Sequence, residues 1–180
     1  MKMEKIYKKR FLNKLIILTV LLLAPIASSA EVGDEKWTKE CDKKNKKVCV
    51  IAINKQIAIP NSDKKQTLAT VLIQLASTTD KLEEKNKPIP VLVIRFPLNV
   101  DLKKQPLIQI DKKNVLNIPF SHCNAKEGCV TSVAIADDVV GLFKSGKELT
   151  LIMAPYGGKD NITINLPLKG FSKAYDRLVK

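Results

Sequence analysis

The sequence of 180 residues predicts a mainly β protein, an antiparallel β-sandwich with one or two short helices. Three observations favour this fold class. Apolar and polar residues alternate through several short runs, as they do in strands that bury one face. Residues typical of turns separate these runs at short intervals, which indicates strands joined by local connections. The four cysteines form two close pairs, and each pair brackets a turn-like stretch.

Residues 1–30 have the features of a cleaved secretory signal peptide. Six basic residues and one acidic residue precede a run of ten residues, Leu15 to Ala24, that is apolar apart from Thr19. Small residues at 28–30 provide a cleavage site. A membrane anchor is the alternative, but ten helical residues span about 15 Å, half of the roughly 30 Å hydrocarbon core of a bilayer. We therefore expect an exported protein whose residues 31–180 form a single domain without a further membrane-spanning segment.

Four strands are predicted in the first half of this domain, where apolar and β-branched runs are bounded by polar stretches. They cover residues 37–41, 48–53, 67–76 and 91–96. The run at 67–76 is apolar enough for a buried strand, although a helix stays open for so short a segment. Residues 60–65 are a loop by composition, and residues 77–90 form a loop or a solvated helical turn rather than a domain linker.

The same alternation predicts further strands in the second half. They cover residues 106–111, 116–120, 129–135, 149–154 and 162–168. Residues 112–114 form a turn of the right length for a hairpin between the first two of these strands. Pro119 favours an edge strand or a bulge, because proline has no backbone N–H to donate to a neighbouring strand. About seven to nine short strands with local connections indicate a sandwich of two sheets.

Two short helices interrupt the β pattern. The first helix covers residues 137–144. We expect Asp137 to cap its first turn and Gly146 to end its last turn. Residues 172–179 form the second helix, with Ser172 as its expected cap. Four apolar side chains share one face of this second helix, which predicts that it packs on the core. They are those of Phe171, Ala174, Tyr175 and Leu178.

All four cysteines lie in the exported part, where disulfides are the default, and four cysteines allow three pairings. We expect Cys41–Cys49 and Cys123–Cys129, because both spacers are rich in turn residues and opposed residues of a hairpin lie near bridging distance. A zinc site made of all four thiolates is the rival, but zinc usually takes spacings of about two to four residues. One histidine and no C-x-x-C also exclude most His-ligated metal centres, c-type haem and a thioredoxin dithiol. We therefore expect no metal and no cofactor.

No group of residues has the pattern of a catalytic site. His122 adjoins Cys123, but neighbours in a strand point to opposite faces, and a disulfide leaves no thiolate to activate. Ser121 lacks the G-x-S-x-G elbow, and Gly157-Gly158 belongs to no phosphate-binding motif. The acidic pairs at 83–84 and 137–138 have no partner carboxylate at a defined spacing. The sequence thus predicts a protein that is not an enzyme.

The chain is basic, with a net charge of +13, of which the signal peptide contributes +5 and residues 31–180 contribute +8. Lysine pairs fall mainly in predicted turns, where lysine often serves only to solvate the turn and guard strand edges. The functional alternative is a polyanion-binding rim made of Lys43, Lys44, Lys46 and Lys47, facing lipopolysaccharide, host glycans or an acidic partner. Nucleic acid is not expected, because the protein is exported and no aromatic residues alternate with these lysines.

Several short elements along the domain follow one another in an order that is typical of a known protein family. They are Trp37, Cys41 and Cys49; Pro97-Leu98 before the strand that ends at Asp111; Phe120, Cys123 and Gly128-Cys129; Lys144-Ser145-Gly146; and residues 168–174 (LKGFSKA). In this order, over about residues 37–175, they resemble the invasion-associated locus B family of exported bacterial proteins. The sequence departs from the family pattern at Asn99 and Gln105, where glycines are expected around the Pro-Leu turn, and in the long loop at 77–90.

The resemblance implies an immunoglobulin-like β-sandwich in the periplasm, with the cell surface or the external medium as alternatives, and it brings no catalytic residues. We expect a non-enzymatic envelope protein that binds a partner or a surface polymer. The second hypothesis is a secreted invasion or adhesion factor that contributes to virulence by contacting host cells. An enzyme comes third, since it would need a cleft that collects polar residues from separate strands.

Overall fold

The computed structural model describes residues 35–44, 48–76 and 88–180. Residues 32–180 form one compact unit, which contains all of the described residues. The expected signal peptide, the acidic pair at 83–84, and the lysines at 46 and 47 lie outside the described residues.

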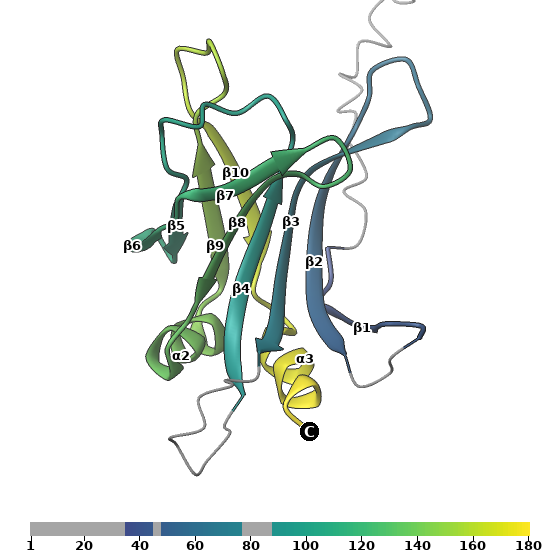
Figure 1. Cartoon of the computed structure of the whole chain (residues 1–180), viewed down its shortest axis with the longest axis vertical. Coiled ribbons are helices and arrows are strands. Elements are labelled where there is room, and N and C mark those ends of the chain that lie inside the picture. Colours follow the sequence, from purple (N-terminus) through teal and green to yellow (C-terminus); the bar gives the residue numbers. More distant parts are fainter. Residues whose placement is uncertain (1–34, 45–47, 77–87) are drawn as a thin grey trace, which may run out of the picture. The chain divides into compact units, whose positions relative to one another are not determined.

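Two antiparallel sheets make up most of the described residues (Figure 1). The larger sheet has the strand order β1-β2-β3-β4-β8-β7 and the smaller has the order β10-β9-β5-β6. The strands are β1 (Thr38–Cys41), β2 (Cys49–Ala58), β3 (Lys65–Ala76), β4 (Ile89–Phe96), β5 (Leu107–Ile110), β6 (Lys113–Asn117), β7 (Phe120–Asn124), β8 (Gly128–Ala134), β9 (Glu148–Met153) and β10 (Ile162–Pro167). The predicted fold class, a mainly β sandwich with two short helices, is confirmed.

Alternating apolar side chains hold the two sheets together. In β4, Leu92, Ile94 and Phe96 are buried, whereas the residues between them are partly exposed. The same period of two recurs in β9 and β10, and the buried side chains of both sheets join in one apolar core. The segment 67–76, for which a helix stayed open, lies within β3 and is a strand.

The expected single strand at 116–120 is wrong. β6 ends at Asn117 in the smaller sheet and β7 begins at Phe120 in the larger sheet, so Ile118 and Pro119 carry the chain between the sheets. Pro119 has no N–H with which to continue the ladder of β6, and the chain leaves that sheet beside it. The preceding hairpin turn also lies earlier than expected, at Asp111 and Lys112, whose φ angles are 49° and 66°.

Both predicted helices are present, α2 (Asp137–Ser145) and α3 (Phe171–Leu178), but their expected caps are wrong. Ala136 and Gly170 occupy the N-cap positions, and neither helix has a side-chain cap hydrogen bond. Ser172 Oγ instead donates to the Lys144 carbonyl at 3.1 Å, so it joins α3 to α2. Tertiary contact with the neighbouring helix thus takes the hydroxyl that sequence alone assigns to the cap.

Gly146 ends α2 as expected, but with φ −72° rather than a left-handed conformation. Glycine is required there by close packing. A Cβ atom at this position would lie 2.5 Å from the Ile110 side chain and 2.9 Å from that of Leu168. The end of α2 therefore packs closely against Ile110 of the smaller sheet and against Leu168, in the segment between β10 and α3.

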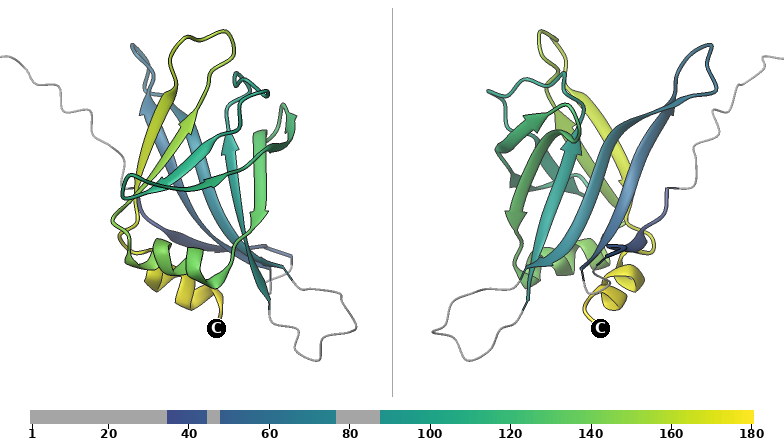
Figure 2. Two further views of the ribbon diagram at one scale, coloured as in Figure 1. Left: turned by 90° about the vertical axis from the view of Figure 1, so that its left-hand side faces the viewer. Right: turned by 45° about the vertical axis from the view of Figure 1, so that its right-hand side comes forward.

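An aromatic cluster fixes α3 at one end of the sandwich, beside α2 (Figure 2). Phe171 is fully buried, and its ring lies 4.9 Å from that of Trp37 and 5.2 Å from that of Phe143. Trp37 Nε1 donates to the Pro167 carbonyl at 3.0 Å. Because Trp37 directly precedes β1, these contacts bring the first strand of the domain next to its last helix.

Candidate functional site

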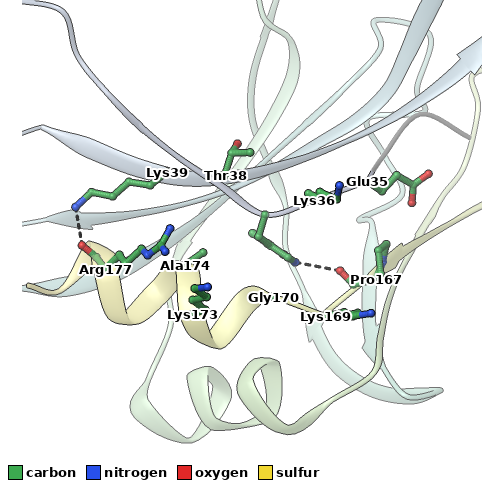
Figure 3. Close-up of a pocket in the computed structure, with 11 residues that line it drawn as sticks. Glu35, Lys36, Thr38, Lys39, Pro167, Lys169, Gly170, Lys173, Ala174 and Arg177 are labelled. Atoms are coloured by element: carbon green, nitrogen blue, oxygen red, sulfur yellow. Dashed lines mark hydrogen bonds between the residues drawn. The ribbon is translucent and has the colours of Figure 1, made fainter.

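A groove of about 730 Å³ lies between β1 and α3 (Figure 3). Its volume falls within the range of about 300–1,000 Å³ that is typical of ligand sites. The lining residues are Glu35, Lys36, Trp37, Thr38, Lys39, Pro167, Lys169, Gly170, Lys173, Ala174 and Arg177. One wall thus comes from the start of the domain and the other from its end.

The groove is strongly basic. Among the described residues that line it, five side chains are cationic and one is a carboxylate. The carboxylate, Glu35, already forms an ion pair in which its Oε1 lies 2.6 Å from Lys55 Nζ. A concave surface with such an excess of one charge concentrates its field and attracts ligands of the opposite charge.

Two cations of the second wall share one side of α3. Lys173 and Arg177 are four residues apart within the helix, while Lys169 lies just before Gly170, the N-cap residue of the helix. The opposite side of α3 carries the buried Phe171 and Leu178. Burial of the apolar side therefore turns the basic side of α3 toward solvent and β1.

Lys36 and Lys39 flank Trp37 on the first wall, and the buried Trp37 ring holds this wall in place. Lys39 Nζ donates to the Arg177 carbonyl at 2.5 Å, near the C-terminal end of α3. A cation at this end also interacts favourably with the helix dipole. The two walls are thus tied together at one end of the groove.

The lysines that the sequence singled out do not form this site. Lys43 and Lys44 are exposed in the turn after β1 and do not line the groove, while Lys46 and Lys47 lie outside the described residues. The groove residues were missed because their walls are far apart in sequence, as Lys39 and Arg177 are 138 residues apart. The four-residue spacing of the cations opposite the apolar face of the last helix was the available signal.

Both disulfides are present with the local pairing, Cys41–Cys49 and Cys123–Cys129, and no cysteine is free. Each bond joins residues that face one another across a strand pair, with 4.0 Å between their Cα atoms. The first disulfide ties β1, and with it the first wall of the groove, to β2.

His122 belongs to a polar cluster around Glu127, in the turn between β7 and β8. Glu127 Oε2 lies 3.4 Å from His122 Nε2 and accepts a hydrogen bond from Asn124 Nδ2 at 3.1 Å. Its Oε1 accepts one from the Arg95 guanidinium at 3.1 Å. The hydrogen bonds from Asn124 and His122, together with the charge of Arg95, lower the pKa of Glu127 below its ordinary value. These contacts stabilise the β7–β8 turn, which the Cys123–Cys129 disulfide also closes. The disulfide leaves Cys123 without a thiol that His122 could activate.

The remaining candidates have structural places. Gly157 and Gly158 form the β9–β10 turn, where Gly157 has φ +70°, and the acidic pair at 137–138 lies in the first turn of α2. Among the described residues, no three His, Cys, Asp or Glu side chains gather as metal ligands. No helix in the described part of the chain is long and apolar enough to cross a membrane.

Comparison with known proteins identifies the family. The family model for invasion associated locus B (IalB) protein matches residues 37–179, which include most of both walls of the groove. No curated protein matches the chain. The crystal structure of invasion associated protein B from Bartonella henselae has a similar fold, with a TM-score of 0.60 and 21% identity over 81% of this chain and 92% of that one. The family expected from the sequence is thus confirmed, and the chain belongs to the invasion associated locus B family.

Proposed function

We propose that this chain is a non-enzymatic, exported envelope protein that binds a partner or a surface polymer in the groove between β1 and α3. The groove itself carries this proposal, since it is concave and its walls come from distant parts of the chain. Export is supported by the sequence of residues 1–30, by the two disulfides and by the exported character of the family. The periplasm is the expected compartment.

The chemistry of the lining favours binding over catalysis. Among the described residues, those that line the groove include no Ser, Cys or His, and the one carboxylate is paired with Lys55. Lysine and arginine side chains at fixed positions select a partner with complementary negative charge, and their field raises the rate of association. The groove needs no further chemical group to perform this task.

The second candidate is a secreted invasion or adhesion factor that contacts host cells. The name of the family and that of the similar Bartonella henselae protein favour it. The two candidates share the groove and differ in the surface that it meets, the bacterium's own envelope or a host cell.

Lysine footprinting tests both. The exported protein is mixed with purified envelope of the bacterium that produces it, treated with an amine-acetylating reagent and analysed by mass spectrometry. Lys169 and Lys173 should be acetylated several-fold less than in the free protein. Lys103 and Lys104, exposed in the loop between β4 and β5, are the internal controls and should react equally in both samples.

Host-cell membranes replace the bacterial envelope in a parallel experiment. Protection by host membranes alone favours the invasion factor. If neither surface protects Lys169 and Lys173, the proposed binding function is wrong.

A further inference from the structure

We propose that the ligand of the groove is a linear polyanion, specifically an acidic polysaccharide chain that lies along α3 between two rows of cations. This inference rests on the proposed function, because it names the ligand chemistry of the same groove.

The first row matches a ligand whose charges repeat along a chain. Within α3, the four residues from Lys173 to Arg177 correspond to about 6 Å along the helix axis. Lys169, which precedes the helix, extends the row in the opposite direction, and all three side chains are exposed (Figure 3). A single small anion would contact one of these cations, whereas a polymer that lies parallel to the helix contacts all three.

The second row lies across the groove. Lys36 and Lys39 project from the segment around Trp37, and Lys39 reaches the Arg177 carbonyl at one end of the groove. A chain in the groove therefore meets cations that come from both walls. The volume of about 730 Å³ far exceeds the space that one sulfate or carboxylate group needs. Among the described residues that line the groove, the one carboxylate is paired with Lys55, so little of the described lining opposes such a ligand.

The uncharged lining distinguishes a polysaccharide from a membrane or a peptide. It includes Gly170 and the buried Trp37 and Ala174, and none of the large exposed apolar side chains of the described residues lines the groove. Docking to a bilayer normally uses such projecting side chains together with basic ones. An extended peptide is normally recognised through pockets for alternate side chains. A polysaccharide chain needs charges at regular intervals and room for its rings, which the groove provides.

The test measures dissociation constants of the exported protein for defined probes at increasing NaCl concentration. The probes are heparin, polygalacturonate, neutral dextran, polyglutamate and vesicles that contain anionic lipid. Heparin represents a sulfated polymer and polygalacturonate a carboxylated one, and we expect at least one of them to bind. The logarithm of its affinity should fall linearly with the logarithm of salt concentration. Dextran should not bind.

A triple variant, Lys169→Gln, Lys173→Gln and Arg177→Gln, should weaken polysaccharide binding by about tenfold or more and flatten its salt dependence. The matched control removes the same charge from exposed loop lysines, with Lys103→Gln, Lys104→Gln and Lys159→Gln, and should weaken binding less than twofold. The near-ultraviolet circular dichroism, to which the buried Trp37 contributes, should be the same in both variants and the wild type.

Equal losses in the two triple variants would overturn the inference, because binding would then follow net charge alone. Tighter binding of polyglutamate or of vesicles than of either polysaccharide would also overturn it, in favour of an acidic peptide or a lipid surface. If the envelope protects Lys169 and Lys173 but neither polysaccharide binds, the ligand chemistry is wrong and the proposed function stands.

Discussion

Thr131 is fully buried in β8, and its hydroxyl has no hydrogen-bond partner among the described residues. A buried hydroxyl without a partner destabilises a protein by about 1–3 kcal/mol relative to an apolar group. Thr131→Val, which keeps the shape and removes the hydroxyl, should therefore raise the free energy of unfolding by about 1 kcal/mol, as measured by urea denaturation. Thr131→Ser keeps the hydroxyl and loses the methyl group, so it should lower that free energy. A less stable Val variant would show that the hydroxyl is satisfied.

The carboxylate of Asp111 binds two backbone N–H groups at the start of β9. It accepts hydrogen bonds from the backbone N–H groups of Glu148 and Lys147, each at 3.0 Å, and these two bonds lower the pKa of Asp111 below its ordinary value of 3.8. A lowered pKa in the folded state means that the carboxylate stabilises the fold above the ordinary pKa. This stabilisation is lost as the pH falls through the folded pKa.

Asp111→Asn should therefore make the protein less stable at pH 7, and its difference from the wild type should shrink as the pH falls below 3.8. Asparagine also tolerates the left-handed conformation of this turn, so the comparison isolates the charge. Urea denaturation at pH 7, 5 and 3 measures the effect. Asp63→Asn, an exposed change in the β2–β3 turn, is the control and should have little effect at pH 7. A difference for Asp111→Asn that stays constant with pH would contradict a role for the charge.

At the scale of one element, helix α2 has one glycine within it and another at its C-cap, and the two have opposite roles. Gly141 lies within the helix, and a Cβ atom there would meet nothing within 4 Å, so Gly141→Ala should raise the free energy of unfolding by about 0.5–1 kcal/mol. Gly146→Ala should lower it by about 1–3 kcal/mol, because the added methyl group overlaps the buried side chains of Ile110 and Leu168. Thermal denaturation of the two variants measures both effects. A stabilised Gly146→Ala variant would mean that the end of α2 is not tightly packed.

The two disulfides provide a matched pair of changes at the scale of the hairpin. They close loops of similar size, with sequence separations of 8 and 6, so replacing either pair by serine should lower the free energy of unfolding by about 2.5 kcal/mol. Only the Cys41–Cys49 bond anchors β1. Its loss should therefore also weaken heparin binding in the groove, whereas loss of Cys123–Cys129 should not. Equal effects on binding would show that the first wall of the groove holds its position without its disulfide.

The elements also differ in how far sequence predicts them. The β10 strand and both disulfide hairpins follow from local alternation and turn residues, which act over a few positions. The break between β6 and β7 does not, because Pro119 indicates only that a ladder is interrupted, while the sheet that accepts the next strand depends on tertiary packing. The groove is the extreme case, since its walls meet only when Trp37 packs against Phe171.

On the scale of the whole molecule, that aromatic contact connects three parts of the fold. Trp37 precedes β1 of the larger sheet, donates a hydrogen bond to Pro167 at the end of β10 in the smaller sheet, and packs on α3. One apolar core includes buried side chains from both sheets and both helices. Such a core predicts a single cooperative unfolding transition, as is usual for a domain of this size.

Trp37 is the only tryptophan of the chain, so its fluorescence reports on this junction alone, whereas far-ultraviolet circular dichroism reports on all strands and helices. In urea, the two signals should have the same midpoint. Heparin bound in the groove should move both midpoints upward together, because a ligand that binds only the folded state stabilises the whole cooperative unit. A fluorescence midpoint at lower urea concentration would mean that β1 and α3 separate while the sheets stay folded, and the groove would then open independently of the sandwich.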